Sequence, residues 1–305
     1  MAKVIIATDK PFAPVAVNGI KEIFNEAGYE TVVLEKYGTQ QALAQAVADV
    51  DAMIVRSDIV DAEILDAAKN LKIVVRAGAG YDNLDLAGCT AKGVVAMNTP
   101  GQNSNAVAEL AFGMMVMAAR GFYSGKAGTE LKGKKIGVHA YGNVGQNVGR
   151  IAKGFGMEVY AFDPFMTPEQ IKAAGAIPVA TVEELYSTCQ YVSIHIPATE
   201  KTKKSIGYDL VGKMPKGAVV VNTARKEVID EEGLIALMNE RQDITYLTDI
   251  APDSEEFKAF EGRYFATPKK MGAQTAEANI NAGLAAARQI VDFIENGNCK
   301  YQVNK

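Results

Sequence analysis

Cysteine and histidine are scarce in this chain of 305 residues, which contains three cysteines and two histidines. Cys89, Cys189 and Cys299 are far apart and form no C-x-x-C pair, and His139 and His195 stand at no metal-ligand spacing. The sequence therefore predicts neither a disulfide framework nor a metal site. An odd, dispersed set of cysteines is typical of a reducing compartment, so we expect a cytoplasmic protein.

Long hydrophobic runs and an excess of positive charge are also lacking. No apolar stretch approaches the ~18 residues of a membrane-spanning helix, and the N-terminal MAKVIIATDK leads directly into a strand pattern rather than a targeting segment. Lysine and arginine total 32 against 36 acidic residues, a formal charge of -4. We therefore expect a small-molecule substrate held in a pocket, and neither a nucleic acid nor a membrane as partner.

Hydrophobic residues make up 48% of the chain, enough for sizeable cores, and the length suggests about two domains. Up to about residue 98, short apolar runs alternate with amphipathic patterns. The runs are Val4 to Ala7, Thr31 to Leu34, Ala52 to Val55, Ile73 to Val75 and Val94 to Met97. Strands that alternate with helices predict a mostly parallel sheet covered by helices, here a flavodoxin-like α/β domain.

A second α/β repeat is expected from residue 99 to 274. It begins with a breaker cluster and a long helical pattern, from about 103 to 121, whose broad apolar face is typical of a core or a subunit interface. Its later apolar runs are 191–194, 218–221, 244–248 and 264–266. A last helical pattern, 276–295, is predicted to return to the first domain. We therefore expect a discontinuous substrate-binding domain, 1–98 with 275–305, a Rossmann-type NAD-binding domain, 99–274, and a ligand cleft where the chain crosses.

The stretch from 134 to 164 has the pattern of a nucleotide-binding βαβ unit. An apolar run meets the glycine turn of Gly142 and Gly145, a helical pattern follows, and a second run ends at Asp163, 18 residues after Gly145. Gly142 lets the backbone approach a pyrophosphate at the helix N-terminus, and Gly145 lets helix and strand pack closely. Ala140 stands at the first glycine of the usual G-x-G-x-x-G, so we expect an ordinary backbone conformation there and a slightly wider turn.

The acid at the end of this unit indicates the cofactor. Asp163 is placed to accept hydrogen bonds from the adenosine ribose, and because Pro164 follows it with no basic residue nearby, a 2′-phosphate is disfavoured and NAD is expected over NADP. The competing interpretation is a flavodoxin-like domain with a tight turn. It explains Gly142 and Gly145 but not Asp163.

Hydride transfer from a hydroxyacid also needs a cation, a proton acceptor and donors for the substrate's remaining charge. In 75–83, glycines between a strand and a helix make a backbone concavity for an anion, although a tight turn is the alternative. Arg225 follows the run 218–221, where its planar fork suits a carboxylate; the alternative is a surface salt bridge. The stretch 267–273 contains Lys269 and Lys270, which by themselves are more typical of solvated surface.

Taken together, five stretches resemble the D-isomer-specific 2-hydroxyacid dehydrogenases. They are 54–65, 74–86, 97–110, the βαβ unit and 220–234. The resemblance implies an NAD-dependent enzyme of two domains, a homodimer through the long helix after Asn98. It further implies oxidation of 3-phosphoglycerate to 3-phosphohydroxypyruvate, the first step of serine biosynthesis.

The resemblance also implies residue roles. Arg225 would bind the carboxylate and polarise the reacting oxygen, and Arg56 with Ser57 would lie near the substrate phosphate. Backbone groups of Ala77, Gly78, Ala79 and Gly80 would hold the carboxylate. Gly142, Asn143, Val144, Gly145, Asp163, Pro164, His195, Ile196, Pro197, Thr223, Ala224 and Asp249 would line the NAD site. His195 is then a cofactor contact rather than a proton carrier.

The sequence departs from the family at the acid/base group. The family's histidine stands in T-P-H-x-G-A, whereas this chain has TPKKMGA, and counting back from Gly272 puts Lys270 in its place while counting forward from Pro268 gives Lys269. We favour Lys270. The glutamate that supports the histidine falls at Ser254, with Asp253 and Glu255 as possible substitutes.

These two losses are consistent with each other. A carboxylate beside a lysine raises the lysine pKa above its reference value of roughly 10.4, whereas a nearby arginine in a closed cleft lowers it. A lysine base near Arg225 therefore predicts no glutamate partner.

Further departures concern the surroundings of the site. Lys226 and Glu227 replace the two glycines usual after the arginine, and in the linker 121–133 a basic residue of the family is missing, with Lys126 as its candidate replacement. The family's longer members carry C-terminal regulatory domains, which this sequence lacks, so we expect no serine feedback through such a domain. The alternative functions are a reductase of glyoxylate, hydroxypyruvate or another 2-oxo acid, and an NAD-sensing binding protein without turnover.

Overall fold

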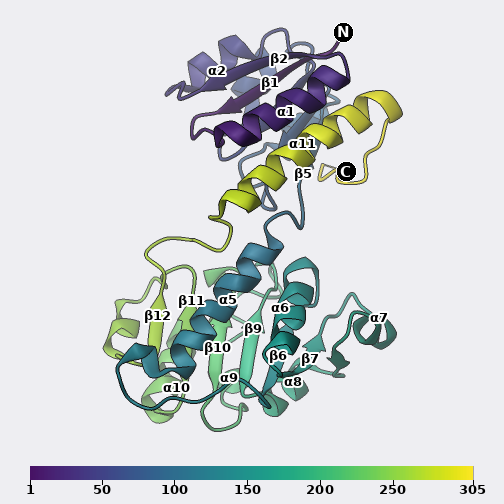
Figure 1. Cartoon of the computed structure of the whole chain (residues 1–305). Helices are drawn as coiled ribbons and strands as arrows, with labels where there is room; N and C mark the ends of the chain where they lie inside the picture. The colour runs from purple at the N-terminus through teal and green to yellow at the C-terminus, as the bar shows by residue number, and fades with distance from the viewer. Residues whose placement is uncertain (305) are drawn as a thin grey trace. The chain divides into compact units, whose positions relative to one another are not determined.

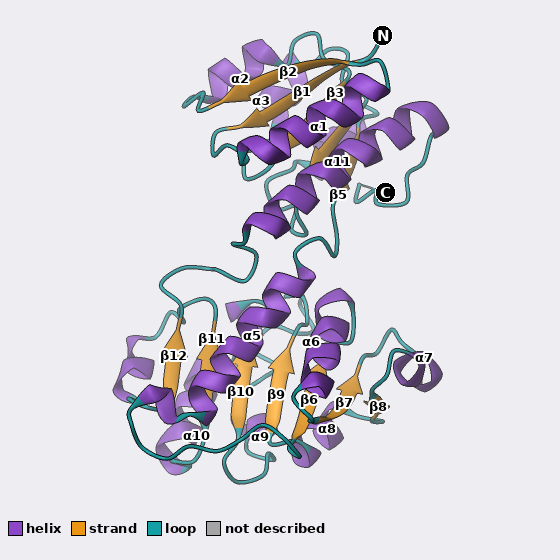
Figure 2. Cartoon of the chain, in the orientation of Figure 1, coloured by secondary structure: helices purple, strands orange, loops and turns teal. Residues whose placement is uncertain are grey.

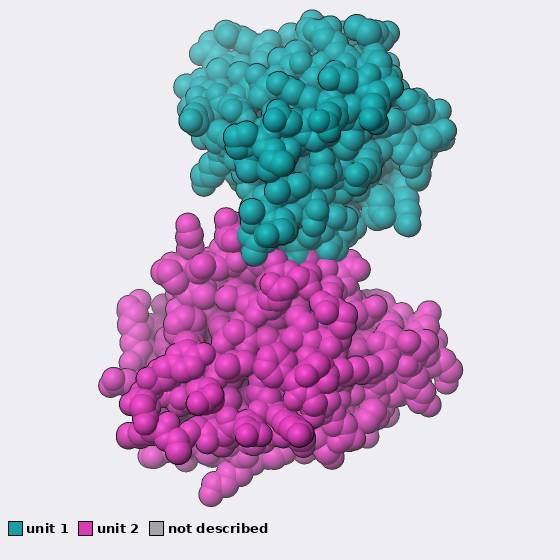
Figure 3. Space-filling model, in the orientation of Figure 1, with its two compact units in different colours: residues 1–103, 275–305 teal, residues 104–274 magenta. Residues whose placement is uncertain are grey.

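The computed structural model describes residues 1–304 and divides into two compact units. Unit 1 consists of Met1–Asn103 and Thr275–Lys305, and unit 2 of Ser104–Gln274 (Figure 3). Each unit contains one parallel sheet with helices on its faces (Figure 2). This confirms the predicted fold class, two helix-covered parallel-sheet domains.

Unit 1, which contains the N-terminus (Figure 1), holds a five-stranded parallel sheet in the order β2-β1-β3-β4-β5. Its elements are β1 (Lys3–Thr8), α1 (Pro14–Glu26), β2 (Glu30–Glu35), α2 (Gln40–Ala46), β3 (Ala52–Val55), α3 (Ala62–Ala67), β4 (Ile73–Arg76), α4 (Leu86–Ala91), β5 (Val95–Asn98) and α11 (Ala276–Asn296). The central strands β3 and β4 are short continuous apolar runs because both faces of a parallel sheet are buried under helices. Their carboxyl ends present Arg56 and Arg76.

The helix α11 packs against α1. Glycine on each helix permits the close approach: a Cβ on Gly19 would lie 2.7 Å from Leu284 Cδ2, and a Cβ on Gly283 would lie 2.9 Å from Ile20 Cδ1. After α11 the chain runs along the edge strand β5, where Met97 and Gln302 form an antiparallel bridge. The final described residues therefore cover the open edge of the sheet.

Unit 2 holds a seven-stranded parallel sheet in the order β12-β11-β10-β9-β6-β7-β8. Its elements are α5 (Ser104–Ala119), η1 (Gly121–Tyr123), β6 (Lys135–His139), α6 (Asn143–Gly154), β7 (Glu158–Phe162), α7 (Pro168–Ala173), β8 (Ile177–Pro178), α8 (Val182–Thr188), β9 (Tyr191–Ile194), α9 (Tyr208–Val211), β10 (Val219–Asn222), η2 (Lys226–Val228), α10 (Glu231–Glu240), β11 (Thr245–Thr248), η3 (Glu255–Ala259) and β12 (Tyr264–Ala266). The order reverses at β6, between β7 and β9. Ligands of doubly wound sheets bind at such a reversal, beyond the carboxyl ends of the strands.

The helix α5 covers this sheet together with α6, and the stacked rings of Phe112 and Phe155 join their surfaces, with centroids 5.2 Å apart. The core-facing residues of α5 fit the apolar pattern predicted for 103–121. Within residues 1–304, no helix combines the length and the apolar character needed to cross a membrane. Those residues also contain no cluster of three or more histidine, cysteine, aspartate or glutamate side chains able to hold a metal ion.

Candidate active site

The glycine turn lies between β6 and α6. Gly142 is the N-cap residue of α6, no side chain caps the helix, and a Cβ on Gly142 would meet nothing within 4 Å. The first backbone N–H groups of α6 are thus left for a ligand, and the positive end of the helix dipole favours an anion there. A Cβ on Gly145 would lie 2.3 Å from Ala140 O, which explains why glycine is required at this position.

The expectation of an ordinary backbone at Ala140 is wrong. Its φ is +75°, in the left-handed region that glycine normally occupies. The Ala140 N–H continues the sheet by bonding Phe162 O at 2.8 Å, while Gly145 packs against the Ala140 carbonyl. Because both neighbours fix the turn, alanine adopts the glycine conformation.

Asp163 lies directly after β7. Its Oδ2 accepts a hydrogen bond from Tyr141 N at 2.8 Å, and its Oδ1 accepts one from Phe165 N at 2.8 Å. The carboxylate therefore ties the glycine turn to the end of β7. Each oxygen keeps a second lone pair, so the group can still accept the ribose hydroxyls that the sequence assigned to it.

The strand β9 lies next to β6 in the sheet and is followed directly by His195, Ile196 and Pro197. The His195 ring is hydrogen-bonded to Ser193 Oγ at 2.9 Å, and burial lowers the pKa of His195 to about 3. The ring is therefore neutral at physiological pH, which fits a contact role better than a proton-transfer role.

The turn after β10 carries Arg225. Asn222, the last residue of β10, is fully buried, and its side-chain amide accepts from Ala224 N at 3.0 Å and donates to Arg225 O at 2.9 Å. The Arg225 side chain is exposed and donates through Nη1 to Ala224 O at 3.1 Å. A short turn, held by two hydrogen bonds to the Asn222 side chain, thus presents the guanidinium at the carboxyl edge of the sheet.

The stretch after β12 brings a lysine to the same carbonyl. Lys270 Nζ donates to Ala224 O at 2.9 Å, so its ammonium and the Arg225 guanidinium share one acceptor. Thr267 Oγ1 donates to Lys269 O at 2.7 Å, and Gly272 N donates to Asp249 Oδ2 at 2.9 Å, which fixes the loop on both sides of Lys270. Of the two candidate lysines, Lys270 is the one that meets Arg225.

Two buried oxygens at the ends of β10 and β11 have no partner among the described residues. They are Thr223 Oγ1 and Asp249 Oδ1. Burial raises the pKa of Asp249, while the charge of Lys270 and the Gly272 N–H act in the opposite direction. Unpaired buried oxygens are rare, and these fit the N–H donors of a carboxamide such as that of nicotinamide. The residues present therefore fit a dinucleotide.

The carboxylates considered as partners of the lysine are engaged elsewhere. Asp253 forms an ion pair with Lys226 Nζ at 2.5 Å, and Glu255 pairs with Lys258. Glu231 accepts backbone N–H groups of Asp253 and Ser254 at 3.0 and 2.8 Å.

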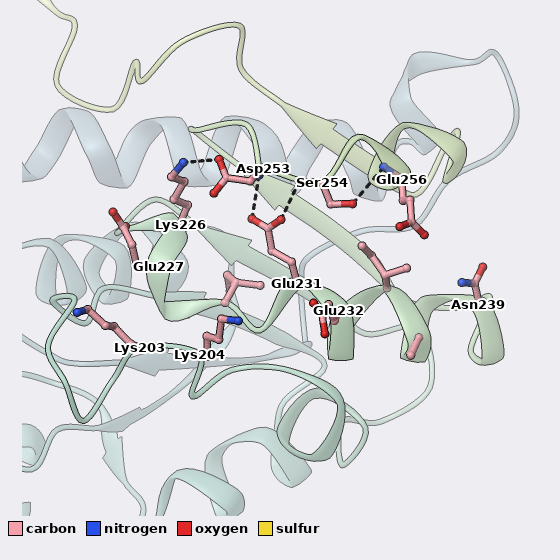
Figure 4. Close-up of a pocket in the computed structure, with 13 residues that line it drawn as sticks. Lys203, Lys204, Lys226, Glu227, Glu231, Glu232, Asn239, Asp253, Ser254 and Glu256 are labelled. Carbon is pink, nitrogen blue, oxygen red and sulfur yellow. Dashed lines mark hydrogen bonds and ion pairs between the residues drawn. The ribbon is translucent and has the colours of Figure 1, made fainter.

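Lys226, Glu231, Asp253 and Ser254 line a pocket of about 890 Å³ (Figure 4). Lys226, which replaces a family glycine, connects the Arg225 turn to the loop after β11 only through its exposed ion pair with Asp253.

In unit 1, Arg56 is a structural residue as well as a candidate phosphate ligand. Its Nη1 donates to the carbonyls of Lys10 and Pro11, each at 2.9 Å, and its Nη2 to Asn279 Oδ1 at 2.7 Å. Three of the five N–H donors are used, and two remain. The adjacent Ser57 is exposed.

The loop of Ala77 to Gly80 lies under a cation that the sequence reasoning missed. A Cβ on Gly78 would lie 1.5 Å from Arg76 Nη1, so the guanidinium rests directly on this glycine, and Arg76 Nε donates to Arg56 O at 3.0 Å. The sequence does contain a signal for Arg76, because it is the last residue of a buried strand. Arg225 likewise comes shortly after a buried strand. The loop is held from β5, where Asn98 Nδ2 donates to Ala79 O at 2.6 Å.

Comparison with known proteins gives a consistent result. A family model described as "D-isomer specific 2-hydroxyacid dehydrogenase, NAD binding domain" matches residues 105–259, which confirms NAD as the cofactor. A D-3-phosphoglycerate dehydrogenase of Methanocaldococcus jannaschii is 34% identical over 269 residues, covering 83% of this chain and 51% of its own. A hydroxypyruvate reductase of Thermotoga maritima is 35% identical over 283 residues, covering 86% of this chain and 90% of its own.

Among solved structures, the NAD+-bound 3-phosphoglycerate dehydrogenase of Entamoeba histolytica is similar over 100% of this chain and 99% of its own. The two share 50% sequence identity, and the TM-score is 0.87. The chain spans about half the length of the curated D-3-phosphoglycerate dehydrogenases from M. jannaschii and Archaeoglobus fulgidus that it matches.

Proposed function

The chain belongs to the D-isomer specific 2-hydroxyacid dehydrogenase family, and we propose that it oxidises 3-phosphoglycerate to 3-phosphohydroxypyruvate with NAD, the first step of serine biosynthesis. Two relatives that carry the name of this activity support the substrate. The observation that carries the proposal is the meeting of Arg225 and Lys270 at one carbonyl, beside the buried oxygens of Thr223 and Asp249.

NAD, when bound, supplies the hydride acceptor. Arg225 pairs with the substrate carboxylate and polarises the reacting oxygen, a task suited to its planar fork. The neutral amine of Lys270 takes the hydroxyl proton as the hydride leaves the carbon. In unit 1, backbone groups of Ala77 to Gly80 bind the carboxylate, and Arg56 with Ser57 binds the phosphate.

The same proposal assigns NAD binding to residues 99–274 and substrate binding to 1–98 with 275–305. The uncapped start of α6 holds the pyrophosphate, Asp163 the ribose, and Thr223 with Asp249 the carboxamide. We further propose a cytoplasmic homodimer that pairs through α5.

The proposal is tested by NADH formation from 3-phosphoglycerate between pH 7 and 10. We expect Lys270→Ala to lower kcat by a factor of ~10² to 10⁴, the usual loss of a general base, with NAD binding retained. The matched control Lys269→Ala should stay within a few-fold of the parent, because that side chain does not meet Arg225. Turnover retained by both variants would show that the proton leaves by another group.

A reductase of an unphosphorylated 2-oxo acid is the second candidate, favoured by the resemblance to the T. maritima hydroxypyruvate reductase. The two remaining N–H donors of Arg56 favour a phosphorylated substrate. Comparing kcat/KM for 3-phosphohydroxypyruvate and hydroxypyruvate separates the two, and a preference for hydroxypyruvate would select the reductase. NAD binding without turnover of any hydroxyacid would instead indicate an NAD-sensing protein.

A further inference from the structure

We infer that Asn222 is a positioning residue, which aims the Ala224 carbonyl so that it holds the Arg225 guanidinium and the Lys270 ammonium side by side. The inference rests on the proposed function, in which these two cations carry the chemistry. Asn222 itself touches neither cationic group.

The side chain of Asn222 fixes the peptide between Ala224 and Arg225 from both sides. It accepts from Ala224 N and donates to Arg225 O, the groups that flank this peptide. Asn222 is fully buried in β10, so its amide is held rigidly by the sheet. With the flanking groups tied to Asn222, the Ala224 carbonyl is directed toward the side chains of Arg225 and Lys270.

A fixed acceptor matters because the two cations repel each other. A carbonyl that accepts from both offsets the repulsion and sets the spacing of the two groups. It also orients the amine: when Lys270 is neutral and gives one N–H to Ala224 O, its lone pair is directed away from that carbonyl. The proton acceptor is then aimed before substrate binds.

The ion pair between Lys226 and Asp253 is a second contact of the same turn, and it serves as the control. Lys226 pairs with Asp253, and Figure 4 shows this pair beside Glu231, which accepts from the Asp253 and Ser254 backbone. The ion pair is exposed, with 33% and 78% of the two side chains accessible, and exposed pairs contribute little. Lys226→Met therefore removes a contact of the turn without releasing the Ala224 carbonyl.

Steady-state kinetics give the first readout. We expect Asn222→Ala to lower kcat by a factor of ~10² or more while the Kd for NAD stays within about threefold, since misplacement of reacting groups by about 1 Å costs that much. Asn222→Ser, whose hydroxyl can accept from Ala224 N and donate to Arg225 O, should recover about tenfold. Lys226→Met should stay within about threefold of the parent.

Acetylation of the lysines gives a readout that needs no turnover. Trace acetic anhydride at pH 10, followed by mass spectrometry, compares Lys270 with its neighbour Lys269 in one peptide. Release from Ala224 O should raise the Lys270/Lys269 labelling ratio by at least about threefold in Asn222→Ala and less in Asn222→Ser, with no change in Lys226→Met.

The two readouts separate the possible failures. An unchanged labelling ratio in folded Asn222→Ala overturns the positioning role, and so does a kcat loss in Lys226→Met as large as that in Asn222→Ala. If Asn222→Ala does not fold, Asn222→Leu, which keeps the side-chain volume but makes neither hydrogen bond, takes its place, and a parent-like kcat and labelling ratio in that variant overturn the positioning role. If Lys270→Ala retains turnover, the proposed base fails, while the labelling ratio still decides whether Asn222 holds the lysine.

Discussion

At the scale of single residues, the turn after β6 holds a strained alanine. Ala140 has φ +75°, a conformation that is unfavourable by roughly 1–2 kcal/mol for a residue with a Cβ. The strain persists because Phe162 O and Gly145 fix the turn from two sides. The site therefore keeps the geometry of a dinucleotide fingerprint without its first glycine.

Replacing this alanine by glycine should stabilise the protein. Relief of the strain exceeds the extra entropy that glycine gives the unfolded chain, so we expect Ala140→Gly to raise the free energy of unfolding by about 0.5–1 kcal/mol. Urea denaturation of the parent and the variant measures this difference in unfolding free energy. The control Ala174→Gly, at an ordinary φ of -76°, should lower stability instead; a loss in both variants would argue against strain at Ala140.

His139 makes stability depend on pH. Its side chain is 8% exposed, and burial lowers the pKa of His139 to about 4, below the roughly 6.5 of the unfolded chain. The unfolded chain therefore binds the proton first, and stability is lost as pH falls through about 6.5 toward 4. Linkage gives a loss of about 2 kcal/mol between pH 7 and 5.

Urea denaturation of His139→Gln at pH 7 and pH 5 checks this. The difference in unfolding free energy between the two pH values should shrink by about that amount relative to the parent. The same pH dependence in the parent and the variant would assign the loss to other groups, His195 among them.

At the scale of elements, the segment after α11 protects the edge of the unit 1 sheet. Asn304 is buried, and its side-chain amide accepts from Ala96 N and donates to Val94 O, each at 2.8 Å, while Val303 N donates to Ala96 O. These bonds satisfy the open side of β5, which would otherwise present unpaired backbone groups.

Asn304→Ala should therefore lower the free energy of unfolding by about 1–3 kcal/mol, because it leaves a buried N–H and a buried carbonyl without partners. Hydrogen exchange should rise at Ala96 in particular. Asn281→Ala, at an exposed position of α11, is the matched control and should change stability by at most about 0.5 kcal/mol. Equal effects of the two variants would refute the role of the segment.

At the scale of the whole molecule, the proposed dimer depends on the outer face of α5. Gly113 is exposed on this helix, and a Cβ there would meet nothing within 4 Å. An arginine at Gly113 is therefore tolerated by the isolated chain but places a charge in any interface that α5 forms. We expect sedimentation velocity to find the parent as a dimer and Gly113→Arg as a folded monomer with an unchanged circular dichroism spectrum. A variant that stays dimeric would exclude pairing through this face.

The two α/β repeats, the dinucleotide turn and the choice of NAD could be predicted from sequence patterns alone. These features are local: apolar runs mark the strands, and the spacing of Gly142, Gly145 and Asp163 lies within one βαβ unit. Such features depend on contacts within a segment of about thirty residues, so they can be predicted without knowing how the rest of the chain folds.

Features that depend on packing between distant segments were settled by the folded structure. It brought Lys270 rather than Lys269 to Arg225, bound three donors of Arg56 to the backbone and Asn279, and placed Arg76 on Gly78. It also kept Ala140 in the glycine conformation, because Phe162 and Gly145 close on it from other elements. Spacing along the chain cannot supply such contacts, since they are set by how the strands and helices pack.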